Sequence, residues 1–287
     1  MRAGLLFQPR NKGAVAMVDQ ACERLSALGH DVWSLSSWEI DASATDFAGT
    51  DLLVSLGGDG TLLRAVRVGA PHGIPCLGVN FGNLGFLTEV EAPEFEEDIG
   101  KYVSEDGWLE ERILLDWQHR RDGQELARGI AVNDLVVARG SISRVIDVGV
   151  AIDGAEVVTY TADGIVVATP TGSTGYALAL NGPIMHPEAR TLAIVPISPF
   201  LTTSNALLAN SGSQIELAVT TRHEVGLTVD GQTHLGMQDG DVVTCTTSEL
   251  RARFLRFRPR NYFFPVLASK MRWSIPAEIL RPNRGAE

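Results

Sequence analysis

The sequence predicts a protein of two units: an N-terminal α/β unit with a Rossmann-like parallel sheet, and a C-terminal all-β unit built as an antiparallel sandwich. Two observations predict this fold class. Over residues 1–110, apolar runs of strand length alternate with stretches of helical periodicity, which is typical of a parallel sheet covered by helices. Over residues 111–260, short runs rich in Val, Ile and Thr are separated by turn sequences, which is typical of antiparallel strands. Residues 261–287 form a tail whose apolar part we expect to dock on the N-terminal unit.

The elements of the N-terminal unit follow from its apolar runs. Gly29 ends the first helix, since glycine readily takes the left-handed conformation, and Pro93 opens the last one, since proline fits the first turn of a helix. Residues 37–50 are polar and rich in Ala, and predict a loop. We expect strands at 4–7, 31–35, 52–56 and 75–79, and helices at 14–28, 62–68 and 93–103.

In the C-terminal unit, Asp-Gly pairs mark the turns, because these residues adopt the positive φ angles of tight hairpins. We expect hairpins at 121–123, 153–154 and 239–241, and a helix only at 174–180. Near the end of the unit, arginines recur with a period of about two, which predicts that they share the solvated face of a strand; the alternatives are binding of the donor phosphate or a subunit contact. These residues are Arg251, Arg253, Arg256, Arg258 and Arg260.

Composition and charge exclude several classes of protein. The 287 residues are 45% hydrophobic with a mean hydropathy of +0.07, as in globular proteins. A net charge of −11 argues against nucleic acid as a partner, because binding to it relies on neutralising phosphates. The three cysteines are scattered and no Cys/His cluster occurs, so neither zinc nor a disulfide framework is indicated. With no apolar run near the ~20 residues of a membrane span, we expect a cytoplasmic protein without a membrane partner.

The most informative motif is Gly57-Gly58-Asp59-Gly60-Thr61, between a buried strand and a helix. A glycine-rich turn that leads into a helix offers free N–H groups and the positive end of the helix dipole to a phosphate. Asp59 would repel a phosphate, so we expect it to serve chemistry, as a general base or as a ligand of a phosphate-bound metal. The alternative is a tight turn whose carboxylate suits the helix dipole. The motif matches neither the P-loop nor the dinucleotide-binding pattern of glycines.

A second motif is the hydroxyl-rich segment 169–176, Thr-Pro-Thr-Gly-Ser-Thr-Gly-Tyr, which follows an apolar strand. Hydroxyl groups both donate and accept hydrogen bonds, which suits amide and adenine edges, and Tyr176 offers a planar face for a ring. Ordinary capping of a helix is the alternative, although capping requires one such residue rather than five.

Further polar and glycine-rich features could join the same site. Asn133-Asp134 and Asp163-Gly164 each lie beside an apolar strand, and their side chains suit an adenine or carboxamide group and the hydroxyls of a ribose. Taken singly, each is more often a turn residue. The glycine-rich segment 78–88 predicts a loop that passes close to a ligand, where Phe86 either stacks on a base or packs in the core.

These motifs resemble those of the NAD kinase family, and they occur in the family's order. They are Gly-Gly-Asp-Gly-Thr at 57–61, Asn-x-Gly-x-Leu-Gly-Phe-Leu at 80–87, Asn133 with an acid after it, Asp-Gly at 163–164 with the hydroxyl-rich segment, and a weaker match at Val229-Asp230-Gly231-Gln232. The resemblance covers about residues 1–270. The first motif is shared with diacylglycerol, sphingosine and phosphofructokinase relatives, whereas the hydroxyl-rich segment is far more specific.

The resemblance implies a two-domain NAD kinase-like fold and transfer of a phosphoryl group from ATP, or from polyphosphate, to the 2′-hydroxyl of the adenosine ribose of NAD. It also implies a divalent metal, Mg²⁺ or Mn²⁺, carried by the phosphate donor, and a homodimer or homotetramer. Asp59 would take the proton of the 2′-hydroxyl. Donor phosphates or nucleotide would bind at Gly57, Gly58, Gly60, Thr61 and Arg64. The adenosine part of NAD would bind at Asn133, Asp134, Thr171 and Thr174, the nicotinamide end at Asp163, Gly175 and Tyr176, and NAD would also contact Phe86 and Asp230.

Some residues depart from the family pattern. Asp134 stands where the family usually has Glu, and Gly175 replaces a common Ala. Asn181 replaces a small residue, Phe200 a His and Asn205 an Arg, and the last two bear on substrate choice or subunit contacts. Two alternatives to an NAD kinase remain: a kinase of the same superfamily that acts on another hydroxyl substrate, and an NAD(H)-binding sensor without catalysis.

Overall fold

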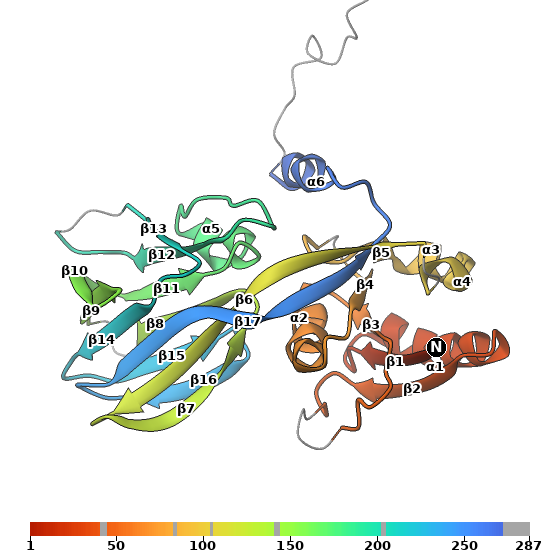
Figure 1. The fold of residues 1–287 in the computed structure, drawn as a ribbon, viewed down its shortest axis with the longest axis horizontal. Helices are drawn as coiled ribbons and strands as arrows, with labels where there is room; N and C mark the ends of the chain where they lie inside the picture. Colours follow the sequence, from red (N-terminus) through yellow and green to blue (C-terminus); the bar gives the residue numbers. More distant parts are fainter. Residues whose placement is uncertain (41–44, 83–84, 104–105, 141–143, 202–204, 272–287) are drawn as a thin grey trace, which may run out of the picture.

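A computed structural model describes residues 1–40, 45–82, 85–103, 106–140, 144–201 and 205–271 of the chain (Figure 1). Part of the motif at 80–87, part of the loop that contains Phe200 and Asn205, and the end of the tail lie outside the described residues. Within these residues, no helix is both long enough and apolar enough to cross a membrane.

The N-terminal unit is a parallel sheet with helices on both faces, as predicted. Its strands pair in the order β4-β3-β1-β2 and are β1 (Arg2–Phe7), β2 (Asp31–Ser36), β3 (Leu52–Gly57) and β4 (Cys76–Asn80). Its two long helices are α1 (Lys12–Ala27) and α2 (Asp59–Gly69). Because side chains alternate along a strand, Leu5 and Val54 pack against α1, whereas Leu6 and Leu53 pack against α2 on the opposite face.

The single helix expected at 93–103 is wrong. The chain forms two short helices there, because Asp98 leaves helical geometry with φ −136° and ψ 68°. Its carboxylate then accepts a hydrogen bond from the backbone N–H of Lys101, which caps the second helix. The short elements of this unit are η1 (Ala70–His72), β5 (Val90–Glu91), α3 (Ala92–Glu97) and α4 (Ile99–Tyr102).

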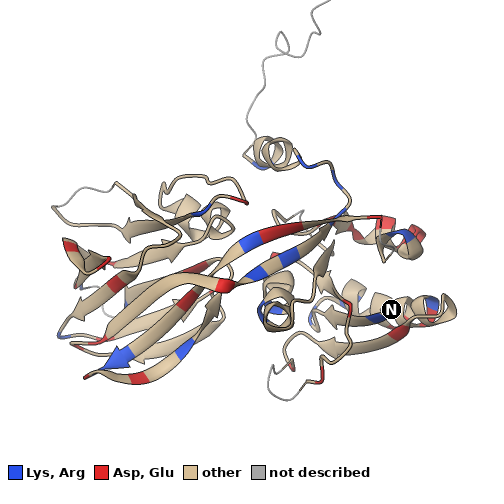
Figure 2. Cartoon of the chain, viewed as in Figure 1, with Lys and Arg blue, Asp and Glu red and all other residues tan. Residues whose placement is uncertain are grey.

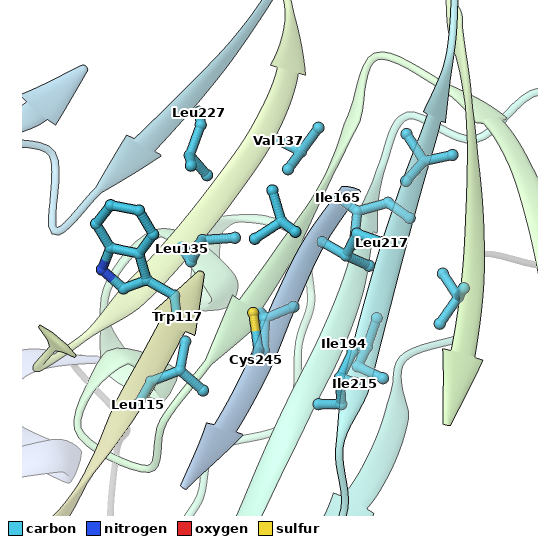
Figure 3. Close-up of a cluster of buried hydrophobic side chains, with 14 of the residues drawn as sticks. Leu115, Trp117, Leu135, Val137, Ile165, Ile194, Ile215, Leu217, Leu227 and Cys245 are labelled. Atoms are coloured by element: carbon cyan, nitrogen blue, oxygen red, sulfur yellow. The ribbon is translucent and has the colours of Figure 1, made fainter. Parts of the chain in front are cut away.

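The C-terminal unit is the predicted antiparallel sandwich. One sheet has the strand order β10-β9-β14-β17-β6-β7 and the other β13-β12-β11-β8-β15-β16. Between them lies a core in which Leu135, Val137 and Ile165 of one sheet face Leu217 and Cys245 of the other (Figure 3). The strands are β6 (Trp108–Arg121), β7 (Gln124–Ala131), β8 (Asp134–Arg139), β9 (Ile146–Ile152), β10 (Ala155–Ala162), β11 (Gly164–Ala168), β12 (Thr191–Ile197), β13 (Leu207–Asn210), β14 (Ile215–Thr220), β15 (Val225–Val229), β16 (Thr233–Met237) and β17 (Val242–Arg256). The helices of this unit are η2 (Gly172–Thr174) and α5 (Tyr176–Ala179), and the tail forms α6 (Phe263–Lys270).

The two units share one sheet. The first part of β17 pairs with β14 of the sandwich, while Phe254 near its end pairs in parallel with Cys76 of β4. Strand β6 runs beside β17 over almost its whole length, so both strands pass from one unit to the other (Figure 1). The predicted boundary between residues 110 and 111 therefore falls inside β6.

The Asp-Gly turns were predicted correctly at two of three places. Asp122-Gly123 and Asp153-Gly154 have positive φ angles and close the hairpins β6-β7 and β9-β10. The turn at 239–241 is not a hairpin, because it joins β16 to β17, which lie in different sheets. A hairpin that was not predicted is β15-β16, whose turn contains Asp230 and Gly231, both at positive φ.

The arginines at the end of β17 do not share a solvated face, and this prediction is wrong for Arg256. Because side chains alternate along a strand, Arg251 and Arg253 lie on one face of β17 and are partly exposed. Arg256 lies on the opposite face and is only 1% exposed. It is held between two buried glutamates, Glu89 and Glu110. The regular spacing was misleading because Arg256 is out of step with the first two arginines.

The described part of the tail contacts both units. Tyr262 is buried where they meet, and the ring of Phe263 lies 5.7 Å, centre to centre, from that of His186 in the C-terminal unit. At the end of α6, the Lys270 ammonium lies 5.3 Å from the ring centre of Phe86 in the N-terminal unit.

Candidate active site

The glycine loop lies at the carboxyl edge of the parallel sheet, where open α/β sheets bind ligands. Strand β3 ends at Gly57 and α2 begins at Asp59, so the loop contains almost no extra residues. A Cβ atom at Gly57 would overlap the side chain of Thr61, which is buried. Among the described residues, no atom would lie within 4 Å of a Cβ atom at Gly58 or Gly60, so contacts with these residues do not explain the two glycines. They keep open the approach to the N-terminus of α2.

The carboxylate of Asp59 is held by the backbone of the neighbouring loop. It accepts hydrogen bonds from the N–H groups of Phe86 at 2.8 Å, Leu87 at 3.1 Å and Thr88 at 3.2 Å. A Cβ atom at Gly85 would overlap this carboxylate, which explains a glycine at that position. A carboxylate offers about four lone-pair positions, and these three donors use three, two on Oδ1 and one on Oδ2. Asp59 is therefore fixed in place, and the hydrogen bonds from the described part of the chain leave one position on Oδ2 for a further proton or ligand.

A second carboxylate, Asp230, organises the segment that carries Asn133 and Asp134. Its oxygens accept hydrogen bonds from the backbone N–H groups of Val132 at 3.0 Å, Asn133 at 2.7 Å and Asp134 at 3.2 Å. Burial raises the pKa of Asp230, which these hydrogen bonds oppose. Burial, followed by the negative charge of Asp230, raises the pKa of Asp134 from 3.8 to about 7. With this pKa, a large share of the Asp134 carboxyl groups carries a proton at neutral pH, and the protonated form can donate a hydrogen bond as well as accept one.

The raised pKa of Asp134 predicts a pH dependence of stability. An unfolded Asp ionises near pH 3.8, so between that pH and about 7 the folded protein holds a proton that the unfolded chain has released. Stability therefore falls as the pH rises through this window. Thermal melts of the unliganded protein from pH 5 to 8 should show the wild type losing stability relative to Asp134→Asn, by on the order of 1–3 kcal/mol. A difference that stays constant over this range would contradict the raised pKa.

The hydroxyl-rich segment uses part of its hydroxyls for its own structure. Thr169 donates to the carbonyl of Val132 at 2.6 Å, and Ser173 donates to the carbonyl of Pro170 at 2.7 Å, so neither is presented to a ligand. Thr171 is also buried, and its oxygen accepts from Arg112 at 3.4 Å. Neither helix of this segment has a side-chain cap, so hydrogen bonds to nearby backbone carbonyls, rather than capping, account for Thr169 and Ser173. The more accessible residues of the segment are Thr174, Gly175 and Tyr176, of which the last is 44% exposed.

Glycines bring the hydroxyl-rich segment into contact with Asn133. A Cβ atom at Gly172 would overlap the backbone carbonyl of Asn133, so the two segments touch through their main chains. A Cβ atom at Gly175 would lie 3.6 Å from the side-chain nitrogen of Asn133 and 3.8 Å from a carboxyl oxygen of Asp134. Asn133, Asp134 and Gly175 are therefore neighbours, although Gly175 was expected at the nicotinamide end and the other two at the adenosine part.

One turn connects this cluster to the glycine loop. Gln232, in the turn that carries Asp230, donates to the carbonyl of Gly60 at 3.0 Å. Its side-chain oxygen accepts from Arg67 of α2 at 2.7 Å. Burial lowers the pKa of Arg67, which the charge of Asp230 opposes. The N-terminus of α2 and the cluster around Asp134 thus form the two sides of one site.

The two family models that match the chain divide it between its two units. Residues 4–107 match the model of the ATP-NAD kinase N-terminal domain, and residues 132–257 match that of the ATP-NAD kinase C-terminal domain. A NAD kinase of Dehalococcoides mccartyi (strain CBDB1) is 36% identical over 272 residues, which cover 94% of this chain and 96% of that protein.

The chain belongs to the NAD kinase family.

Further relatives agree in sequence and in structure. A NAD kinase of Geobacter sulfurreducens is 40% identical over 224 residues, 78% of each chain. The crystal structure of an NAD kinase from Archaeoglobus fulgidus in complex with ATP has a TM-score of 0.76 at 28% identity and covers 95% of this chain and 99% of that one. Yeast NADH kinase, complexed with NADH, has a TM-score of 0.78 at 23% identity, covers 96% of this chain and 88% of that one, and shares the fold. As a member of the NAD kinase family, the protein is a phosphotransferase.

Not every residue expected in the NAD kinase site lies with the others. Asp163 precedes β11 and its carboxylate binds Arg139 at 2.5 Å, whereas the hydroxyl-rich segment begins after β11. A strand of five residues separates these points by about 17 Å, so Asp163 is at the other end of the strand. Phe86 is half-buried beneath Lys270, and Arg64 lies on α2 with a 3.5 Å hydrogen bond to the carbonyl of Ser37.

Among the departures from the NAD kinase pattern, Asn181 has a physical account, since it is exposed at φ 60°, a conformation that Asn tolerates better than most residues. Phe200 is 59% exposed and Asn205 is exposed. Arg67 was not predicted as part of the site, and Gln232 was predicted only as part of a weak motif. Neither residue carries a local signal for its contact, because each partner lies far away along the chain.

Proposed function

We propose that this NAD kinase transfers the γ-phosphoryl group of ATP to the 2′-hydroxyl of the adenosine ribose of NAD, with Asp59 as the general base. The 2′-oxygen forms a bond to the γ-phosphorus while the bond from that phosphorus to the leaving oxygen of ADP breaks, and the hydroxyl proton passes to Oδ2 of Asp59. The observation that carries the proposal is the position of Asp59. Its carboxylate is fixed by three backbone N–H groups on the side of the site that carries the glycine loop, which Gln232 ties to the cluster around Asp134.

Phosphoryl transfer requires mainly positioning and stabilisation of charge from the protein. Gly57, Gly58 and Gly60 would hold donor phosphates at the N-terminus of α2, where free N–H groups and the helix dipole favour negative charge. Thr61 stabilises the loop from beneath. Arg64 and Arg67, one turn apart on α2, add positive charge on the same side.

On the other side of the site, Asn133 and Asp134 would bind the adenosine part of NAD with Thr171 and Thr174. Gly175, Tyr176 and Phe86 would line the rest of the dinucleotide, and Asp230 would act by holding the Asn133 segment. Because Asp163 lies at the other end of β11, its contact with the nicotinamide end requires an oligomer in which another copy supplies it.

A divalent metal, Mg²⁺ or Mn²⁺, would come with the donor phosphates. Within the described ranges, no group of three or more His, Cys, Asp or Glu side chains is placed to hold a metal ion. These side chains therefore fit a metal held mainly by phosphate oxygens, while the remaining position on Oδ2 of Asp59 is left for the proton of the 2′-hydroxyl. Such a metal would neutralise charge on the transferred group.

The test is an assay for NADP. The protein is incubated with NAD, Mg²⁺ and either ATP or polyphosphate, and NADP is measured with an NADP-specific dehydrogenase. We expect NADP to form with ATP and to disappear when EDTA replaces Mg²⁺. Formation with polyphosphate alone would overturn the choice of donor. Binding of NAD in a calorimeter, without NADP from either donor, would support a sensor instead.

A further inference from the structure

A buried network of ionisable side chains lies where the two units meet, and the proposed function does not use it. Its members are Glu89, Glu110, Arg112, Arg256 and Tyr262, none more than 6% exposed. Arg256 binds Glu110 through Nε at 2.8 Å and Glu89 through Nη1 at 3.1 Å. Figure 2 shows the charged residues on the stretch of β6 and β17 that lies between α2 and α6.

Arg256 and Asp59 bind opposite ends of the same peptide group. Arg256 Nη1 donates to the carbonyl oxygen of Leu87 at 2.7 Å. The N–H of that peptide group belongs to Thr88 and donates to Asp59 Oδ1 at 3.2 Å. A cation, one amide and the proposed base thus form a continuous chain of hydrogen bonds from the interior to the site.

This arrangement acts on Asp59 in two ways. A cation on a carbonyl oxygen polarises the amide, so its N–H becomes a stronger donor to the carboxylate. The guanidinium also anchors the loop, because Arg256 is itself held by two glutamates and lies 4.9 Å and 5.1 Å from the ring centres of Phe254 and Tyr262. Arg256 therefore fixes the loop that carries the three N–H donors, on the side that faces away from Asp59.

Stability alone is a weak explanation for such a network. Buried ion pairs lose the hydration of both partners and are often no more stabilising than apolar residues of the same volume. A planar guanidinium that reaches a carboxylate and a carbonyl at once is instead suited to holding groups in fixed positions.

We propose that Arg256 is a positioning residue for catalysis, which orients and polarises the peptide group that holds Asp59. This inference rests on the proposed role of Asp59 as general base. Arg256 touches neither substrate nor donor in it, and the whole effect passes through the peptide between Leu87 and Thr88.

The main variant is Arg256→Lys, which keeps the buried positive charge but has no planar guanidinium to bind Glu110 and Leu87 together. We expect kcat to fall ~10- to 10²-fold, as for a small displacement of a catalytic group, with KM for NAD changed less than about threefold. The matched control is Arg253→Lys on the same strand. Arg253 pairs with Glu111 at 3.0 Å and is partly exposed, so this control should keep normal kcat.

A second readout does not depend on activity. Hydrogen exchange of the amides at 86–88 in the unliganded protein should become ~10-fold faster in Arg256→Lys and stay unchanged in Arg253→Lys. If Arg256→Lys fails to fold, the charge-balanced double variant Arg256→Met/Glu89→Gln takes its place, since it removes one charge of each sign. Normal exchange together with normal kcat in a folded variant overturns the proposal.

A double-mutant cycle separates this proposal from the proposed function. If Arg256 acts through Asp59, adding Arg256→Lys to Asp59→Asn lowers kcat little further, whereas fully additive losses overturn the proposal. Normal turnover in Asp59→Asn alone contradicts the base. The exchange rates then still decide whether Arg256 positions the loop.

Discussion

Replacement of Asp59 by Asn is expected to lower kcat by about 10²- to 10⁴-fold or more, the usual contribution of a general base, while NAD binding stays nearly intact. The Asn oxygen can still accept the N–H groups of Leu87 and Thr88, so the loop should keep its place. The amide nitrogen, however, cannot take up a proton from the 2′-hydroxyl, and it faces the N–H of Phe86 with another donor.

The measurement combines kcat from NADP formation with the Kd of NAD from calorimetry. Asp51→Asn is the matched control, because Asp51 lies at the opposite end of β3 from Asp59 and its exposed carboxylate accepts a hydrogen bond from the backbone N–H of Arg2 at 2.7 Å. That variant should retain normal turnover. Near-normal kcat in Asp59→Asn would remove Asp59 from the role of base.

Replacement of Gly172 by Ala is expected to disrupt the NAD side of the site. The new Cβ atom would overlap the backbone carbonyl of Asn133, and a main-chain atom cannot move aside as the end of a side chain can. Overpacking of this kind costs about 1–3 kcal/mol of stability. Because Asn133 and Asp134 move with the carbonyl, we also expect the Kd of NAD to rise by about tenfold or more.

Thermal melts and NAD titration of the same preparation test this expectation. Gly226→Ala is the control in the same unit, since the nearest atom of the described residues to its Cβ atom would be the carbonyl oxygen of Leu235 at 3.8 Å. Wild-type NAD affinity in a folded Gly172→Ala protein would show that the contact between the two segments does not shape the site.

The fold class was predictable because it depends on local patterns. Alternating helical and strand periodicity marked the N-terminal unit, and each of the turns at Asp122-Gly123 and Asp153-Gly154 adopts the positive φ angles that its residue types favour. The helix at 93–103 was overestimated because the pattern of apolar residues continues across Asp98, where the backbone departs from helical geometry.

The site was predictable only in part, for the same reason. Glycines and a carboxylate in one short segment identified the loop around Asp59, whose role as base stays a prediction. Other contacts join residues that are far apart along the chain, such as Gln232 with Gly60 and Arg256 with Leu87. No local sequence pattern predicts these contacts. From the sequence, Arg256 was therefore predicted to be a surface arginine, whereas in the folded protein it lies buried between Glu89 and Glu110.

The shared strand β17 has a consequence for the order in which the protein can fold during synthesis. Strand β4 emerges from the ribosome early, and β5 soon pairs with Val79 and Asn80 at one end of it, but the partner of Cys76, Phe254 of β17, is made only near the end of the chain. Until then part of this edge of the parallel sheet is open and can pair with other nascent chains. Contacts of such wide sequence separation also form slowly. The sheet of the N-terminal unit is therefore incomplete and prone to association until β17 has been synthesised.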